Sequence, residues 1–475
     1  MAHRSGESRG QTTLFPVMLD ELVDDDAIVR VIDAWVGSLE LRALGFSRTQ
    51  SAATGRPPYD PADLLKLYVY GYLNGVRSSR RLERECLRNV EVMWMLGRLA
   101  PDHKTIANFR RSESEALVAS AAAFVQFARA KGLVAGETVS IDGTKLRAVA
   151  SRKAIVGQRD LAAQAEALRE RMRGYLSELD EIDSQEAPIP TRRQAVQEAL
   201  KQLREQETHV QRQARTLSNS GSSTLVSNEP TARVMKSLHG APGYNLQTAV
   251  DTVSHLIVHH AVVSDTSDRS QLEPVAKAAA KVLENAALNV IADKGYSNGE
   301  QLEALQAEGL TVLLPPQRSI NPQGDGAYYD RSVFKYDAAT NSWTCPAGEL
   351  MKQRGRNLAN KMLLYAPEKG ICKDCPQKPN CTSGKRRWVS RSFFEDALQA
   401  CQKRLDDKPE AMRQRRSTVE HPYGTIKDHI LGNARLLMRG MAGARAELSL
   451  AVLAYNLKRV VSMKGGVWMR NAAAA

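Results

Sequence analysis

The sequence predicts a mixed α/β sheet with helices on its faces, preceded by an all-helical segment. The first observation is the order of elements up to residue 315, where strand-like segments alternate with helical ones. Three strands, a helix, a strand, a second helix and a strand are typical of a mixed sheet covered by helices. The second observation is a helical repeat over residues 156–215, which interrupts the strands and predicts an insertion.

Length and charge limit the class of partner. The chain has 475 residues, enough for two or three domains, and a net charge of +13. This positive excess favours a polyanion, either nucleic acid or an anionic membrane surface. The N-terminal residues contain no apolar signal core, and no apolar segment is long enough to span a bilayer. We therefore expect a soluble cytoplasmic protein that binds nucleic acid and not a membrane.

The N-terminal segment, residues 1–135, is expected to be helical. Asp60 is a predicted N-cap, with Pro61 at the first position of a buried helix. Three short helices are expected over residues 78–88, 90–99 and 102–111. Basic residues lie on them, including Arg80, Arg81, Lys104, Arg110 and Arg111. Short basic helices fit a helix-turn-helix DNA-binding unit. An ordinary helical domain with arginines along its surface is the alternative, and both stay open here.

The α/β domain is expected over residues 136–155 and 230–470. TVSID, which ends at Asp142, is β-branched and alternating, and GTKLRAVAS is expected to be its partner strand. Later strands are predicted at GYNLQTAVD, HLIVHHAVVS, NVIAD and TVLL, and the third of these ends at Asp293. Residues 156–229 are expected to form an inserted helical hairpin, because apolar residues recur there at alternating spacings of four and three.

Asp142 and Asp293 are candidate site residues because both are expected at strand ends. Sites in open α/β sheets lie beyond the carboxyl ends of strands. Each aspartate also has a purely structural interpretation. Asp142 with Gly143 is a favoured type I′ hairpin turn, and Asp293 fits an Asx turn.

A third candidate group is Arg416-x3-Glu420-x6-Lys427. Pro422 is tolerated only in the first turn of a helix, so we expect the helix to begin at residues 417–418. Glu420 and Lys427 are then about two turns apart on one face. A carboxylate flanked by two cations suits a site that holds a metal ion and a phosphate, whereas a solvated helix face is the structural alternative.

Clustered cysteines predict a small subdomain over residues 340–385. Thiols that cluster in a reducing compartment suggest metal and not disulfides. A CxxC pair with two further cysteines suits tetrahedral Zn²⁺ coordination, with a cluster of reduced thiols as the alternative. The candidate ligands are Cys345, Cys372, Cys375 and Cys381.

Taken together, VSIDGTKLRAVAS, GYNLQTAVD, NVIADKGYS and the Arg-Glu-Lys group resemble the DDE transposases of bacterial insertion sequences, in the branch with a Tyr-x2-Arg-x3-Glu-x6-Lys signature. PDHKTIANFRR resembles the helical N-terminal domain of that family. The resemblance implies an RNase H-like catalytic domain in which Asp142, Asp293 and Glu420 bind two Mg²⁺ or Mn²⁺ ions. Arg416 and Lys427 would contact DNA. The sequence departs from the signature at Arg413, where the family has tyrosine.

The resemblance also implies a reaction and its partners. The protein would bind the terminal inverted repeats of an insertion sequence, cut double-stranded DNA at the element ends and join the 3′-OH to target DNA. A homodimer is expected, because the reaction joins paired ends. Two alternatives remain at this stage: an RNase H-like metal-dependent endonuclease without strand transfer, and a catalytically silent DNA-binding protein.

Overall fold

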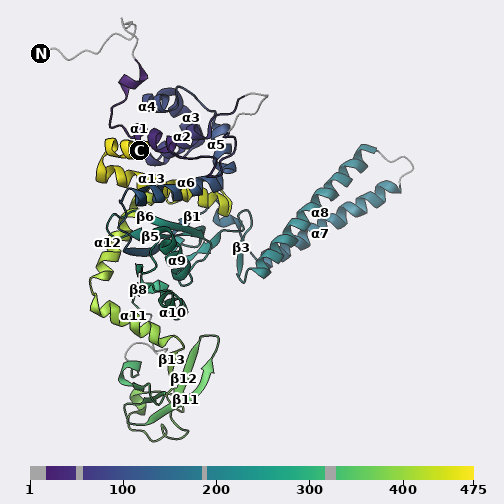
Figure 1. Ribbon diagram of the computed structural model, residues 1–475. Coiled ribbons are helices and arrows are strands. Elements are labelled where there is room, and N and C mark those ends of the chain that lie inside the picture. Colours follow the sequence, from purple (N-terminus) through teal and green to yellow (C-terminus); the bar gives the residue numbers. More distant parts are fainter. Residues whose placement is uncertain (1–17, 50–56, 185–189, 316–327) are drawn as a thin grey trace, which may run out of the picture.

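The computed structural model describes residues 18–49, 57–184, 190–315 and 328–475. In Figure 1 the N-terminal helices lie at one end, the mixed sheet in the middle and a small antiparallel sheet at the other end. A helical hairpin projects to the side. The sequence predicts a break in this hairpin at Pro188 and Pro190; Pro188 lies outside the described residues, and Pro190 begins the second helix.

The N-terminal helices follow the predicted order. Asp60 and Asp102 cap two of them as N-cap residues, because Asp60 accepts from the Ala62 N–H and Asp102 accepts from the N–H groups of Lys104 and Thr105. The six helices are α1 (Ile28–Gly37), α2 (Pro61–Leu73), α3 (Ser79–Arg88), α4 (Val90–Met95), α5 (His103–Ser112) and α6 (Ser114–Ala130).

Helix α13 (Gly440–Lys464) joins the N-terminal helices to the sheet. It packs against α2 and α6 on one side and strand β6 on the other, and most of its residues are buried. Helix α14 (Gly466–Ala474) then packs on α1. The N-terminal helices and the sheet therefore share one hydrophobic core. In the parts of the chain that the structure describes, no helix is long and apolar enough to cross a membrane.

The central sheet is mixed, as the sequence predicts. Its order is β4-β5-β1-β7-β8, and β6 pairs with β5 beside β4. Strand β5 is antiparallel to β1, β4 and β6, whereas β7 runs parallel to β1 and β8. The strands are β1 (Thr138–Arg147), β4 (Arg233–Met235), β5 (Ala241–Asp251), β6 (Ile257–Val263), β7 (Asn289–Ile291) and β8 (Thr311–Leu313).

Strand β1 corrects one sequence-based expectation. Asp142 does not end a strand, and Gly143 does not make a hairpin turn. Both residues are paired within β1, opposite Thr248 and Gln247 of β5. The polypeptide can run straight through this dipeptide because β5 supplies a continuous partner on the far side.

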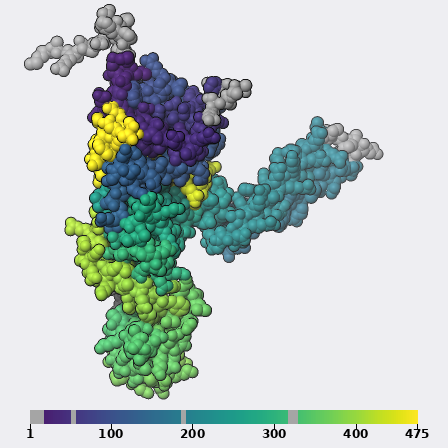
Figure 2. Space-filling view, viewed as in Figure 1, coloured from purple at the N-terminus to yellow at the C-terminus, as the bar shows by residue number. Residues whose placement is uncertain are grey.

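The inserted hairpin consists of α7 (Gln158–Asp183) and α8 (Pro190–Asn219), which pack along each other. The short strands β2 (Ile155–Gly157) and β3 (Thr224–Val226) pair at its base. Figure 2 shows the hairpin standing away from the rest of the molecule. The predicted apolar seam is its core, with buried members Leu161, Ile182, Val196, Leu200, Leu203 and Val210.

Helices α9 (Leu272–Leu283) and α10 (Gly299–Ala307) connect strands of the sheet, and α11 (Glu395–Asp407) leads into α12 (Ala411–Gly424). The expected start of α12 at residues 417–418 is wrong. The helix begins at Ala411, and the Thr418 hydroxyl donates to the Gln414 carbonyl instead of capping an N-terminus. Pro422 lies inside α12, which continues as a π-helical turn, Thr425–Ile430.

The cysteine-bearing segment is more ordered than its loop-like composition suggests. It forms a five-stranded antiparallel sheet with its own core around Trp343, Met351 and Tyr365. The sheet order is β13-β12-β11-β10-β9. Its strands are β9 (Lys335–Asp337), β10 (Ser342–Thr344), β11 (Leu350–Asn357), β12 (Met362–Ala366) and β13 (Val389–Ser392).

A buried ion pair attaches the N-terminal helices to the C-terminal segment. Arg77, between α2 and α3, is 8% exposed, and its Nη1 lies 2.8 Å from Oε1 of Glu447 in α13. Arg77 also donates to the carbonyl groups of Leu431 and Arg435. Glu447 is fully buried and accepts from the N–H groups of residues 437 and 438. Every charge in this group is therefore matched by a partner.

We expect Arg77→Met to lower the free energy of unfolding by about 3–5 kcal/mol, because it leaves the Glu447 carboxylate buried and unpaired. Urea denaturation followed by circular dichroism measures this change. The double variant Arg77→Met/Glu447→Gln removes both charges and should be more stable than Arg77→Met alone. Equal stability of wild type and Arg77→Met would contradict a role for this pair.

Candidate active site

The two strand-associated aspartates lie side by side. Ser140 of β1 pairs with Ile291 of β7 in parallel register. Asp142 is two residues beyond Ser140, and Asp293 is two residues beyond Ile291. Side chains alternate along strands, so both carboxylates leave the sheet on the same side and at the same level. The sequence-based expectation that these acids converge is thus matched by their geometry, although Asp142 lies within its strand and not at the end.

Arg415 of α12 lies between the two carboxylates. Its Nη2 atom is 2.8 Å from Oδ1 of Asp142 and 3.6 Å from Oδ2 of Asp293. The side chains of Arg415 and Asp142 are 14% and 20% exposed, whereas that of Asp293 is 46% exposed. The site is therefore open to solvent on the Asp293 side.

Burial dominates the electrostatics of Asp142. It raises the pKa of this carboxyl, and the charges of Asp293 and Asp268 act in the same direction. Arg415 and the Gly143 N–H, which donates to Asp142 Oδ1 at 2.8 Å, oppose the rise. The site thus concentrates negative charge where a cation is favourable.

Tyr423 fixes α12 against β1. Its hydroxyl donates to the backbone carbonyl of Asp142 at 2.6 Å and lies 2.8 Å from the Thr248 hydroxyl of β5. Burial raises the pKa of Tyr423 well above its usual value, so the phenol stays protonated and can donate. Sequence reasoning missed both Arg415 and Tyr423. Had α12 been extended back to residue 411, helical spacing would have placed them near one face.

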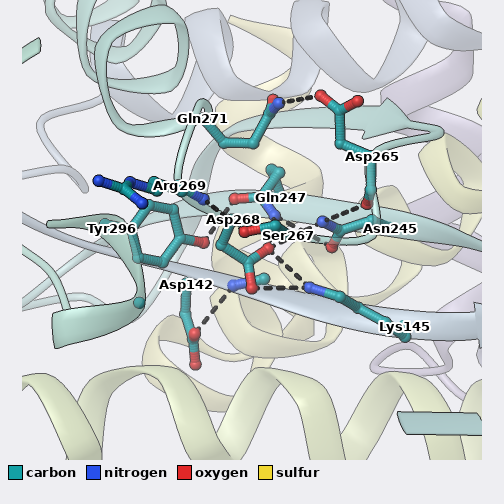
Figure 3. A network of polar contacts seen from close by, with 12 residues as sticks. Asp142, Lys145, Asn245, Gln247, Asp265, Ser267, Asp268, Arg269, Gln271 and Tyr296 are labelled. Carbon is teal, nitrogen blue, oxygen red and sulfur yellow. Dashed lines mark hydrogen bonds and ion pairs between the residues drawn. The ribbon is translucent and has the colours of Figure 1, made fainter. Parts of the chain in front are cut away.

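A polar network supports β1 from its other side (Figure 3). Asp268 accepts from Lys145 Nζ at 2.6 Å, from Asn245 Nδ2 at 2.8 Å and from Gln247 Nε2 at 2.6 Å. Tyr296 donates to the Gln247 side-chain oxygen. Asp142 points away from this network. These contacts fix the backbone that carries Asp142 without occupying the space in front of its carboxylate.

Gly143 is the point where the network and β1 meet. A Cβ atom at this position would lie 2.3 Å from Gln247 Nε2 and 2.6 Å from Asp268 Oδ1. No side chain fits there without displacing this network. The sequence predicts a turn at Gly143, whereas in the structure this glycine permits close approach within a strand.

Glu420 is on α12 but is exposed, five residues after Arg415. Within the described ranges, no three His, Cys, Asp or Glu side chains are arranged as a metal-binding group. Asp142 and Asp293 are thus brought together, and Glu420 does not join them here. Arg416 is also exposed.

Lys427, on the π-helical turn, is half-buried. Burial lowers its pKa, whereas the negative charges of Asp428 and Asp142 act in the opposite direction. Lys427 therefore belongs to the electrostatic surroundings of Asp142.

The basic residues of the N-terminal helices fall into two groups. Arg110 is a correction, because it is 7% exposed, lies over the Tyr68 ring and donates to the Tyr72 hydroxyl. It is a core residue and is not available to a phosphate. The other four predicted DNA-binding residues of these helices are exposed, namely Arg80 and Arg81 on α3 and Lys104 and Arg111 on α5.

The four candidate zinc ligands surround one small cavity of about 30 Å³. They are Cys345, Cys372, Cys375 and Cys381, and all four are free thiols of intermediate exposure. Burial raises the pKa of Cys381, and the other three thiols add to this rise. Cys86 and Cys401 are buried elsewhere.

We expect Gly143→Ala to lower the free energy of unfolding by about 1–3 kcal/mol, because the added methyl group forces Gln247 and Asp268 apart. Chemical denaturation measures the change. Gly174→Ala is a matched control, since its Cβ would meet nothing within 4 Å. This control should be neutral or stabilising by up to about 1 kcal/mol in the exposed helix. Equal effects of the two substitutions would show that the space at Gly143 is not limiting.

Comparison with known proteins identifies the family. Residues 17–112 match the family model "Transposase domain (DUF772)", and residues 182–457 match "Transposase DDE domain". Asp293 and Glu420 lie within the second match, and Asp142 precedes it. No curated protein matches.

Among solved structures, one similar chain comes from the "Cryo-EM structure of piggyBac transposase synaptic complex with hairpin DNA (SNHP)". It is 10% identical over 96% of this chain and 78% of that chain, with a TM-score of 0.32, which is too low to establish a shared fold. The DDE family model alone covers more than half of the sequence. The chain therefore belongs to the DDE transposases of insertion sequences, enzymes that cut DNA and transfer the cut strand.

Proposed function

We propose that this transposase cuts DNA at the ends of its insertion sequence and joins the 3′-OH to target DNA with Asp142, Asp293 and Glu420 as its catalytic acids. The observation that carries the proposal is the shared contact of Asp142 and Asp293 with one cationic group, at equivalent positions of two adjacent parallel strands. The mixed sheet supports an RNase H-like catalytic domain.

Divalent metal dependence follows from the family, and the donor set at this site fits such an ion in part. Asp142 and Asp293 offer the hard oxygen ligands that Mg²⁺ and Mn²⁺ prefer, and both already face one positive charge. Glu420 would complete the set from α12. Asp142, Asp293 and Glu420 would hold two such ions, which would supply positive charge at the attacking and leaving oxygens of phosphoryl transfer.

The remaining residues of the site would position DNA. Lys427 is half-buried near Asp142 and can neutralise a phosphate beside the reacting group. Arg416 is exposed on the same helix and would contact the backbone further out. Gly143 and the network around Asp268 would hold Asp142 still while the DNA is cut.

The domain assignment extends this proposal. Residues 1–135 would bind the terminal inverted repeats, residues 136–155 and 230–470 would carry catalysis, and residues 156–229 form the insertion. The exposed residues Arg80, Arg81, Lys104 and Arg111 support a DNA-binding role for α3 and α5. Two protomers would act together as a homodimer, one on each end, because the product joins both ends to one target.

The triad is tested by cleavage of a labelled duplex that carries the element's own terminal repeat, with Mg²⁺ or Mn²⁺. We expect Asp142→Asn, Asp293→Asn and Glu420→Gln each to cut at least about 100-fold more slowly than wild type, since each loses part of the site that stabilises the transition state. A filter-binding assay on the same duplex should show retained DNA binding.

Glu410→Gln is the matched control, because Glu410 is an exposed carboxylate at the start of the same helix. It should cut at the wild-type rate. A triad variant that cuts normally would remove that residue from the site. Pre-cut ends incubated with target DNA test strand transfer separately, and cleavage without joined product would identify a nuclease.

We also propose that Cys345, Cys372, Cys375 and Cys381 bind one structural Zn²⁺ ion. Their placement around one cavity of about 30 Å³ supports this assignment. Because the described residues show no ready-made metal group, the four thiols would draw together on binding. The ion would cross-link the loop that holds Cys372 and Cys375 to the antiparallel sheet.

We expect purified protein to contain one zinc per chain by elemental analysis, and Cys375→Ser to lose it. The same variant should expose the β9–β13 sheet to proteolysis, because the cross-link is lost. Cys401→Ser removes a buried thiol outside the cluster and should keep its zinc. Zinc-free wild type with an intact β9–β13 sheet would refute the site.

A further inference from the structure

Arg415 has the position of a bound cation. It reaches Asp142 and Asp293 from α12, at 2.8 Å and 3.6 Å, and its side chain is only 14% exposed. Arg415 lies outside the Arg416-x3-Glu420-x6-Lys427 group, so the family signature gives it no role. Its contacts nevertheless involve both strand-borne acids proposed to hold metal.

The charges show that Arg415 and a divalent ion compete. With Arg415 in place, the two carboxylates and the guanidinium group together carry a net charge of about −1. A divalent ion bound to the same oxygens would lie within a few ångströms of the guanidinium group, and like charges at that distance repel even though solvent reaches the site on the Asp293 side. Metal binding at these two acids is therefore disfavoured while Arg415 stays in place.

Helix geometry relates Arg415 to Glu420. Residues on an α-helix are rotated by about 100° each, so Glu420 points about 140° away from Arg415. Tyr423, which contacts Asp142, points about 80° away from Arg415, and Val419 lies between the two around the helix. Val419 is buried and Glu420 is exposed. The face of α12 that packs on β1 thus runs from Arg415 through Val419 to Tyr423, and Glu420 lies about 60° beyond Tyr423, at the exposed edge of this face.

Two features indicate that this arrangement can change. Among the described residues, the buried Nε of Arg415 has no hydrogen-bond partner, so the guanidinium group is incompletely satisfied where it lies. Pro422 cannot donate a backbone hydrogen bond within α12, and a π-helical turn follows at Thr425–Ile430. Both interrupt the regular helical ladder within ten residues after Glu420.

We propose that Arg415 is an internal counter-ion that keeps Asp142 and Asp293 in a metal-free resting state and leaves them when a divalent cation and DNA bind. The released guanidinium group would contact a DNA phosphate, and α12 would turn Glu420 towards the two aspartates. The resting contact would disfavour metal loading, and hence cleavage, before DNA is in place. This inference rests on the proposed assignment of Asp142 and Asp293 as metal ligands.

The experiment is Mn²⁺ titration of the full-length protein without DNA, with free Mn²⁺ measured by its electron paramagnetic resonance signal. We expect Arg415→Gln to bind Mn²⁺ at least tenfold more tightly than wild type, which corresponds to about 1.4 kcal/mol. Arg415→Lys keeps the positive charge and should stay within about threefold of wild type, equivalent to about 0.7 kcal/mol. Arg413→Gln, which removes an exposed arginine of the same helix, is the matched control and should not change the affinity.

A second arm adds a duplex with the element's terminal repeat. Wild type should then gain affinity for Mn²⁺, whereas Arg415→Gln should gain less, because its counter-ion is already absent. The double variant Asp142→Asn/Arg415→Gln should lose the tight binding, which locates the ion at Asp142. Circular dichroism melting checks that each variant is folded. If Arg415→Gln proves unfolded, the wild-type titration with and without DNA and the Arg415→Lys variant still decide the question.

The outcomes separate this inference from the proposed function. Equal Mn²⁺ affinity of folded Arg415→Gln and wild type would overturn the counter-ion role while leaving the metal site intact. Weaker Mn²⁺ binding by Arg415→Gln would also overturn the counter-ion role and would show that Arg415 helps to hold the metal site together. If no variant, with or without DNA, shows Mn²⁺ binding that Asp142→Asn removes, the proposed metal site is refuted instead.

Discussion

The candidate active site depends on strand β1 running unbroken through Asp142 and Gly143. Pairing with β5 continues across this dipeptide, and the missing side chain at Gly143 lets Gln247 and Asp268 approach the strand from one side. The other side is then free to present Asp142 to Arg415 and Tyr423. If the strand turned at this point, Asp142 would no longer lie beside Asp293, and the two carboxylates could not both contact the Arg415 guanidinium group.

Positive charge has more than one use in this protein. The net charge of +13 is consistent with DNA as the partner, yet several arginines are structural. Arg77 is buried between the N-terminal helices and the C-terminal segment, where a carboxylate and carbonyl oxygens accept its hydrogen bonds, and Arg110 is buried among the N-terminal helices, where it donates to the Tyr72 hydroxyl. Arg415 is partly buried against two aspartates. A buried guanidinium group needs several acceptors in a fixed arrangement, so these arginines connect segments far apart in the chain.

Helix α12 lies between the two aspartates and the segment that contacts Arg77. It begins after α11, contacts β1 through Arg415 and Tyr423, and leads through the π-helical turn to the segment that Arg77 holds. Movement of α12 would therefore be transmitted to the surroundings of Arg77, next to the helices proposed to bind DNA.

The sequence by itself determined the order and type of most elements. Alternating apolar residues identified the strands of the mixed sheet, and the seam from Leu161 to Val210 identified the hairpin, because both patterns follow from the geometry of a single element. The resemblance of several sequence segments to DDE transposases was enough to predict the family, and it made Asp142 and Asp293 candidate site residues. Local residue preferences wrongly predicted a turn at Asp142–Gly143 and a start of α12 at residues 417–418. Strand pairing and helix packing override the turn and proline preferences at these positions.

Only the tertiary structure decided which charged residues meet. Whether an arginine is exposed, as Arg111 is, or buried, as Arg110 is, depends on neighbours from distant segments. The adjacent arginines Arg415 and Arg416 look equivalent in the sequence, yet Arg415 contacts both aspartates, whereas Arg416 is exposed to solvent. The contact between Arg415 and the two acids arises from strand register, helix rotation and burial together, and none of these can be derived from residue spacing alone.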